Sequence, residues 1–314
     1  MDAVFKRVLH DFSWLLDLRS IDYFVQKQWS RLPSSWQSAF KNFKPEDCVD
    51  FFSRPSVGTK NVLPLSLLCV KIIGNSLPSR EPIKSPCALA AIFGVDAVKG
   101  LDDFSGGIPS EVISTKVSPK KQHEIARLVT TIKVMKQSRY GDNFDTVVDV
   151  GAGIGHLSRV ISSVIPSCSV VSVEQNKDLL VESDRLSKKI RSPSFVPPLL
   201  HQESVASSCH GSALDVLSDG QKGLLVGLHP CGDLSASILR LFVKSSQLSA
   251  VVLVGCCYHK LSVRCSSHSG SSNADEDRIG FPLSSMFRDV ALTSVGLDLA
   301  CHANENFIGQ LESR

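Results

Sequence analysis

Four short apolar runs constrain the fold of this chain more than any other feature of its sequence. They are TVVDVG (146–151), SVVSVE (169–174), GLLVGLH (223–229) and AVVLVGC (250–256). All four are largely apolar, three of them are rich in β-branched residues, and helix-length segments separate them. Strands of this kind are typical of a parallel sheet buried on both faces by helices. We therefore expect an α/β fold built on such a sheet.

A further strand and a long helix complete the expected framework. Residues 195–205 (FVPPLLHQESV) are the candidate strand between the second and third runs, although their two prolines weaken it. SPKKQHEIARLVTTIKVMKQ (118–137) is expected to be a helix, with Ser118 as its cap and Pro119 in its first position. The expected apolar face of this helix contains Ile125, Leu128, Val129, Ile132 and Met135.

The chain ahead of this helix has a different pattern. Residues 1–75 carry apolar side chains at helical spacing and include the run LPLSLLCVKIIG. Residues 75–118 mix Pro, Ser and Gly and are expected to connect two parts of the chain. The Ser-rich segment 262–280 is expected to be a loop. These patterns predict a helical N-terminal region with a linker over 1–117 and a second domain over 118–314.

Composition limits the cellular setting. The N-terminus lacks the apolar core of a secretory signal, and no run approaches the roughly 18 apolar residues of a membrane span. The ten cysteines are therefore expected to be mostly thiols in an intracellular compartment, cytoplasm or nucleus, with no membrane association. A formal net charge of +3 neither demands nor excludes a nucleic-acid partner.

The stretch DVGAGIGHLSR, which follows the first expected strand, predicts a nucleotide-like ligand. Parallel α/β sheets bind ligands outside the carboxyl ends of their strands. A dinucleotide fingerprint would place a glycine three positions after the second one, but this chain has His156 there. Its glycines are Gly151, Gly153 and Gly155, with Asp149 ahead of them. This spacing favours S-adenosylmethionine over NAD.

S-adenosylmethionine also explains the acids beside the glycines. The ligand carries an ammonium and a sulfonium, which carboxylates complement, and glycines let the backbone approach its methionine and adenosine parts. Glu174 ends the second expected strand, where an acid can accept hydrogen bonds from both ribose hydroxyls. Lys120, with Lys121, could meet the cofactor carboxylate or an RNA phosphate at the start of the helix over 118–137. More often such lysines are simply solvated.

Two polar clusters leave the fourth and fifth expected strands. They contain His229, Cys231 and Asp233 on one strand and Cys256, Cys257, Tyr258 and His259 on the other. In a doubly wound sheet these strands should be neighbours. We expect an acceptor pocket in which His229 or His259 removes a proton and Tyr258 contacts the substrate, with Asp233 also in the catalytic set. The alternatives are a zinc site, which we do not expect, and cysteines that only fill space while Asp233 caps a helix.

Three motifs together resemble a known family. DVGAGIGHLSR, GLHPCGDLS and VGCCYHKLS, with SPKKQHEI upstream, are similar to the methyltransferase-like family also called ribosomal RNA adenine dimethylase domain-containing protein. The resemblance runs from the N-terminal helices to about residue 310. It implies a Rossmann-like class I methyltransferase sheet and cofactor residues at Asp149, Gly151, Gly153 and Glu174. The His-x-Cys-Gly and Cys-Cys-Tyr-His elements also resemble those of tRNA 2′-O-methyltransferases that act on the acceptor stem.

The resemblance makes RNA the first acceptor to consider. Adenine N6-methylases usually carry Asn or Asp, prolines and an aromatic residue after the fourth strand, whereas this chain has HPCGD. A protein acceptor and a non-catalytic binding module are the alternatives.

Class I enzymes add a sixth and a seventh strand to the sheet, but the last residues of this chain show no strand pattern. We therefore expect these C-terminal strands to be missing, and self-association through the exposed edge of the fifth strand.

Overall fold

A computed structural model describes much of the chain. The described residues are 2–44 except 17, 20 and 21; residue 47; 83–95; 108–113 except 110; 117–139; 143–205; 217–263 except 218 and 219; 280–301 except 283, 288 and 291; and residue 309. The expected apolar run LPLSLLCVKIIG and most of the expected loop over 262–280 lie outside these residues. The chain divides into two compact units, residues 1–80 with 257–314 and residues 81–256.

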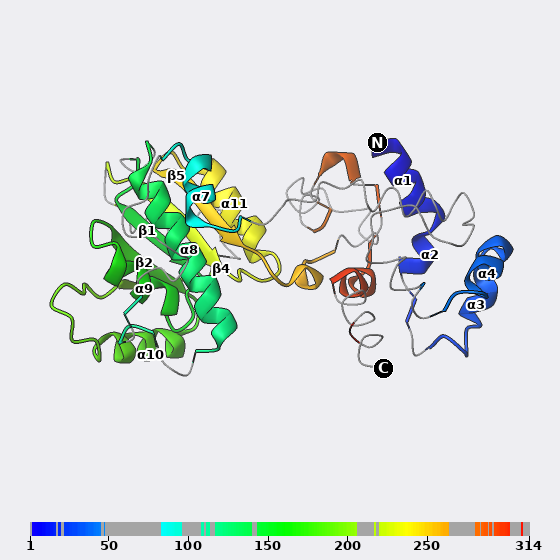
Figure 1. Cartoon of the computed structure of the whole chain (residues 1–314), viewed down its shortest axis with the longest axis horizontal. Helices are drawn as coiled ribbons and strands as arrows, with labels where there is room; N and C mark the ends of the chain where they lie inside the picture. The colour runs from blue at the N-terminus through cyan, green and yellow to red at the C-terminus, as the bar shows by residue number, and fades with distance from the viewer. Residues whose placement is uncertain are drawn as a thin grey trace, which may run out of the picture. The chain divides into compact units, whose positions relative to one another are not determined.

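The unit of residues 81–256 contains a five-stranded, wholly parallel sheet with the order β3-β2-β1-β4-β5 (Figure 1). The strands are β1 (Thr146–Val150), β2 (Ser169–Glu174), β3 (Leu199–Gln202), β4 (Gly223–Leu228) and β5 (Leu248–Val254). This confirms the α/β fold class and all five expected strands. The prolines of the third expected strand lie just ahead of β3, and β3 lies at an edge of the sheet.

Helices cover both faces of the sheet because alternate strand residues point to opposite sides. On one face, Val147 of β1 packs in a core with α8 (Pro119–Gln137) and α9 (His156–Val164). On the other, Val148 and Val150 pack with α11 (Leu234–Lys244). Another helix, α10 (Lys177–Ser187), packs on β2 and β3. The sheet is therefore the middle layer of three.

Helix α8 forms as its sequence predicts. Pro119 takes its first position, and the Oγ of Ser118 accepts a hydrogen bond from the backbone N–H of Lys121 at 3.3 Å. All five residues of the expected apolar face are buried: Ile125, Leu128, Val129, Ile132 and Met135. A short helix, α7 (Pro86–Ile92), packs on α8 through Leu89 and Ala90. The unit of the sheet thus begins ahead of residue 118, and the expected domain division stays a prediction.

The other unit is built from short helices. They are α1 (Asp2–Asp11), α2 (Ser13–Leu16), α3 (Gln28–Arg31), α4 (Ser34–Phe40) and the 3-10 helices η4 (Tyr258–Lys260) and η6 (Ser285–Phe287). Within this unit Phe12 stacks on the buried Trp36 at 4.9 Å between ring centroids. Lys6 Nζ lies 2.8 Å from the carboxylate of Asp289. In the described residues no helix has the length and apolarity of a membrane span.

Strand β5 forms one edge of the sheet. The whole of β4 is buried except for its half-buried last residue, whereas in β5 only Leu248 is buried. On its outer side β5 has no partner strand among the residues that the structure describes. Val254, its last residue, is 38% exposed.

Candidate functional site

The turn between β1 and α9 takes a backbone conformation that favours glycine. Gly151, Gly153 and Gly155 have φ angles of +74°, +58° and +72°. Other residues rarely adopt positive φ, because their Cβ meets the backbone. The backbone N–H groups of Gly151 and Ala152 donate to the carbonyl of Val173, at 2.9 and 3.1 Å, so the turn is fixed to β2.

The turn lies where ligands bind in sheets of this type. Strand β1 pairs with β2 on one side and with β4 on the other, and strand order reverses between β1 and β4. The chain leaving β1 and the chain leaving β4 run in opposite directions across the sheet, and sheets of this type bind their ligands at that point, outside the carboxyl ends. Two cavities among the described residues lie instead at the opposite edge of the sheet, where the strands begin. Thr146 lines the cavity of about 410 Å³, and Ser249 lines the cavity of about 330 Å³.

Glu174, at the end of β2, is bonded directly to the glycine turn. Its Oε2 accepts a hydrogen bond from the backbone N–H of Gly153 at 2.9 Å, and its Oε1 accepts one from Asn176 at 3.0 Å. The residue is 8% exposed. Since a carboxylate has about four acceptor sites, two of them remain for a ligand. Glu174 can therefore both fix the turn and receive hydroxyl groups.

The three glycines differ in what surrounds them. A Cβ on Gly155 would lie 2.4 Å from the Oγ of Ser183, and a Cβ on Gly151 would lie 3.1 Å from a methyl group of Leu234. A Cβ on Gly153 meets no heavy atom of the described residues within 4 Å. Gly151 and Gly155 therefore lie against side chains of neighbouring helices, whereas Gly153 faces open space. That opening suits a ligand which must approach the backbone closely.

Asp149, which was expected to complement the cofactor, is 2% exposed within β1. Its Oδ2 accepts a hydrogen bond from the Oγ of Ser158 at 2.6 Å. Burial raises the pKa of Asp149 to about 6, although the hydrogen bonds to Ser158 and the charge of Lys121 act in the opposite direction. The carboxyl group is thus held beneath the turn, and its role in cofactor binding stays a prediction.

A buried arginine, Arg159, supports the turn from below, and no local sequence pattern singled it out. It is 2% exposed, and its Nη1 donates to the carbonyl of Ile154 at 2.6 Å. Its Nη2 lies 3.0 Å from Nδ1 of His156. The pKa of His156 falls to about 4 because of burial, with the charges of Arg159 and Lys121 adding to the effect. A neutral His156 is then an acceptor for the guanidinium.

The lysines at the start of α8 differ in position. Lys120, which was expected to bind the cofactor, is exposed, whereas Lys121 is half-buried. The charge of Lys121 lowers the pKa values of both Asp149 and His156. Lys121 is therefore a cation near the glycine turn, in addition to Arg159, and the role of Lys120 stays a prediction.

At the end of β4, His229 is held by two fixed contacts. Its backbone has a φ of +64°, which is unusual for a residue other than glycine, and its N–H donates to the carbonyl of Val254 at 3.0 Å. Its Nε2 lies 2.7 Å from Oε2 of Glu124 on α8. Strained backbone of this kind is concentrated at functional sites. Glu124 was not among the expected residues, although its spacing of three from Lys121 places both on one helix face.

The remaining expected catalytic residues lie on other elements than His229 does. Asp233 occupies the N-cap position of α11, and its side chain makes no capping hydrogen bond there. Tyr258 and His259 lie on η4, which belongs to the other unit. Their participation beside His229 stays a prediction.

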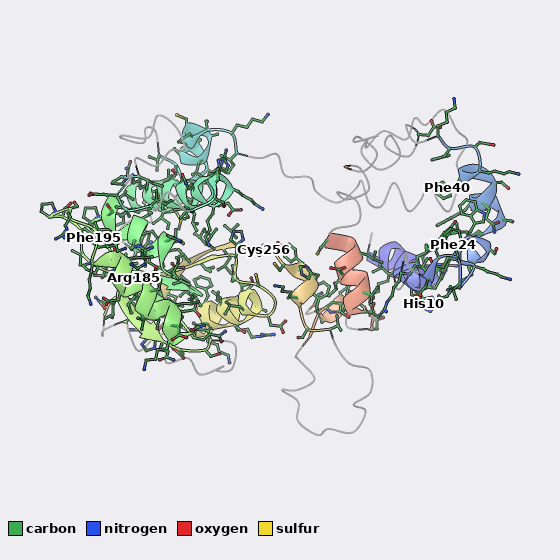
Figure 2. All side chains as sticks on the ribbon, turned by 90° about the horizontal axis from the view of Figure 1, so that it is seen from below. His10, Phe24, Phe40, Arg185, Phe195 and Cys256 are labelled. Atoms are coloured by element: carbon green, nitrogen blue, oxygen red, sulfur yellow. The ribbon has the colours of Figure 1, made fainter. Side chains whose placement is uncertain are left out.

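Two thiols come into contact beyond the ends of β4 and β5. The Sγ atoms of Cys231 and Cys256 are 3.3 Å apart, and Figure 2 labels Cys256. With Cys257, which directly follows Cys256 in the chain, their Sγ atoms all lie within 4.8 Å of one another. The sequence predicted that β4 and β5 are neighbours, and the contact between Cys231 and Cys256 at the ends of these strands agrees with this.

Comparisons with known proteins agree with the fold. Residues 120–264 match the family model described as Methyltransferase domain. The Mus musculus protein named probable methyltransferase-like protein 25 is 29% identical over 189 residues, which are 60% of this chain and 28% of that protein. The Homo sapiens protein of the same name is 30% identical over 124 residues, which are 39% of this chain and 20% of that protein. The matches therefore span less than a third of either relative.

Among solved structures, a putative RNA methyltransferase from Pyrococcus horikoshii has 15% sequence identity and a TM-score of 0.30. The match covers 55% of this chain and 73% of that one. So slight a likeness carries no argument about the acceptor. The comparisons support a methyltransferase-like family, and they confirm neither the adenine dimethylase name nor the similarity to acceptor-stem tRNA methyltransferases.

Proposed function

We propose that the unit of residues 81–256 binds S-adenosylmethionine at the glycine turn and transfers its methyl group to an acceptor. The observation that carries this proposal is the bond between Glu174 and Gly153, which places an acid with spare acceptor sites beside open backbone. When bound, the cofactor supplies an electrophilic methyl group on a sulfonium. The turn would hold its methionine and adenosine parts, and Glu174 its ribose.

His229 is the group that we propose to receive the acceptor's proton. Its Nε2 faces Glu124, so its Nδ1 is the atom that can take a proton. Glu124 fixes the orientation of the ring, and we assign it a positioning role. A hydroxyl or N–H acceptor needs such a base because it must lose a proton as its bond to the methyl carbon forms.

RNA is the acceptor that we propose. The support is the similarity of GLHPCGDLS and VGCCYHKLS to elements of methyltransferases that modify the acceptor stem of tRNA. The half-buried Lys121 adds a cation near the turn. Labelled S-adenosylmethionine incubated with the chain and with separate cellular RNA and protein fractions tests the choice. Label in protein alone would contradict an RNA acceptor, and binding without label in either fraction would indicate a non-catalytic module.

Calorimetric titration tests the cofactor site itself. We expect the chain to bind S-adenosylmethionine or its demethylated product and not NAD. Glu174→Ala should weaken binding by about 1–3 kcal/mol, because ligand hydroxyls and the Gly153 N–H both lose their acceptor. Glu174→Gln should be no milder, since its amide NH₂ group would face one of two backbone donors.

Glu182→Ala is the matched control for this titration. Glu182 is an acid on α10 that pairs with Arg185 at the surface, so its removal should leave the affinity unchanged. Equal affinities for Glu174→Ala and the unmodified chain would remove Glu174 from the site. Binding of NAD at comparable strength would contradict the choice of cofactor.

A further inference from the structure

Cys231 and Cys256 are set in a rigid frame at the ends of neighbouring strands. The last backbone hydrogen bond between these chains joins the N–H of His229 to the carbonyl of Val254. Cys231 lies two residues after His229, and Cys256 lies two residues after Val254. Since the two segments run parallel, these equal distances along the sequence bring the two cysteine side chains together. The Oγ of Ser235 donates a hydrogen bond to the carbonyl of Pro230 at 2.7 Å, which fixes the turn that contains Cys231.

The resulting contact is closer than ordinary packing of sulfur atoms. The two Sγ atoms are 3.3 Å apart, and neither residue is fully buried. Cys168, in contrast, is 7% exposed and lies in the core beside β2. A dithiol is oxidised when a small oxidant can reach one sulfur and the second sulfur is within reach of the first. The pair of Cys231 and Cys256 meets both conditions.

We propose that Cys231 and Cys256 form a reversible dithiol–disulfide site whose oxidant is hydrogen peroxide. One thiolate attacks a peroxide oxygen, the O–O bond breaks, and a sulfenic acid forms with release of one water after protonation. The second thiolate then attacks the sulfenic sulfur, the S–S bond forms and the S–O bond breaks, releasing a second water. Both sulfurs are oxidised and the peroxide is reduced to water. An external thiol reverses the step by exchange.

A zinc site is the competing use of these sulfurs, because Cys257 would provide a third ligand. A tetrahedral structural site needs four protein ligands. Among the described residues, the group of His, Cys, Asp and Glu side chains at this place contains three. His229, two residues before Cys231, is not a member of this group. The dithiol is therefore favoured, and bound zinc is an outcome of the test.

The test uses the full chain, reduced and then treated with hydrogen peroxide. Remaining thiols are alkylated, and the protein is digested without reductant for mass spectrometry. We expect a cross-linked peptide pair joining Cys231 to Cys256, lighter than the two free peptides by two hydrogen atoms and lost on reduction. Cys231→Ser and Cys256→Ser should each abolish it. Cys168→Ser and Cys257→Ser should leave it unchanged.

Three results would overturn the proposal. The first is a cross-link that joins Cys256 to Cys257, or either partner to a cysteine outside the pair, in place of the expected one. The second is oxidation of both residues to sulfinic acids without a cross-link. The third is about one zinc ion per chain in the untreated protein, lost in Cys231→Ser, which would make these sulfurs metal ligands. None of these outcomes depends on methyl transfer, so the proposed function is tested separately.

Discussion

The buried carboxyl group of Asp149 makes the stability of the protein depend on pH in an unusual direction. Its pKa is raised from 3.8 to about 6, so the folded state binds its proton more tightly than the unfolded state does. The unfavourable burial of the charge is therefore complete above pH 6 and disappears as the pH falls toward 3.8. In most proteins a folded carboxylate has the opposite effect.

Asp149→Asn removes this titration and keeps an oxygen for Ser158. On going from pH 7 to pH 5, we expect the unmodified chain to gain about 1–2 kcal/mol of unfolding free energy relative to the variant. Urea denaturation of both proteins at the two pH values measures this. The lowered pKa of His156 destabilises the fold as the pH falls, but it is common to both proteins and cancels. A difference independent of pH would contradict the raised pKa.

Arg159 offers a second prediction for a single residue. Its charge is one of the three causes that hold the pKa of His156 near 4. Arg159→Met should therefore raise the pKa of His156. It should also weaken cofactor binding, because the carbonyl of Ile154 loses its donor. Proton NMR titration of the imidazole measures the pKa.

The matched control is Arg185→Met on α10. Arg185, labelled in Figure 2, pairs with Glu182 at the surface, and its charge is not among the causes of the His156 shift. We expect an unchanged pKa of His156 in this variant. The same pKa of His156 in Arg159→Met and the unmodified chain would show that the charge of Arg159 does not contribute to the shift, and that burial and Lys121 account for it.

At the scale of secondary-structure elements, two glycine substitutions in the turn between β1 and α9 distinguish the cost of backbone strain from the cost of a steric clash. Gly153→Ala adds a methyl group in open space, so it should cost only the strain of a positive φ, about 1 kcal/mol. Gly155→Ala carries the same strain and also a contact with Ser183 at 2.4 Å, so it should cost about 2–4 kcal/mol. Thermal denaturation compares the two.

Cofactor affinity should rank these two variants differently from stability. Gly153 faces the space in which we place the ligand, so its variant should lose affinity out of proportion to its small loss of stability. Affinity unaffected by Gly153→Ala would place the ligand elsewhere.

The elements themselves were largely predictable from sequence, and the contacts between them were not. Apolar runs and the Ser118-Pro119 helix start are local signals, and they located four of the five strands and α8, while β3 was placed only as a candidate within 195–205. The bond between Glu124 and His229 joins residues far apart in the chain, and a single half-buried acid on a helix gives no local signal of its partner. Arg159 was missed because arginine is almost never fully buried, so its pattern favours a surface position.

For the molecule as a whole, we expect self-association through β5, which is an edge of the sheet among the residues that the structure describes. Unpaired backbone groups on an apolar strand are a template for another chain. We expect concentration-dependent dimers or larger species by light scattering. Val254→Lys, at the edge, should reduce them, because a charge at an edge strand opposes pairing.

Val243→Lys is the control for this edge. Val243 lies on α11 and is 82% exposed, so the substitution adds the same charge at another apolar surface position of the same unit. We expect it to leave self-association unchanged. If it abolishes the dimers while Val254→Lys does not, the helix surface and not the strand edge makes the contact.

The strand order also determines what a growing chain can do as it leaves the ribosome. The central strand β1 pairs with β2, which is made soon after it, and with β4, which begins only at Gly223. Until then β1 is itself an edge, and a nascent chain presents an apolar strand for chaperones to cover. Gly153 and Glu174 are both synthesised before His229. The residues of the proposed cofactor-holding half of the site therefore leave the ribosome before the proposed proton acceptor is synthesised.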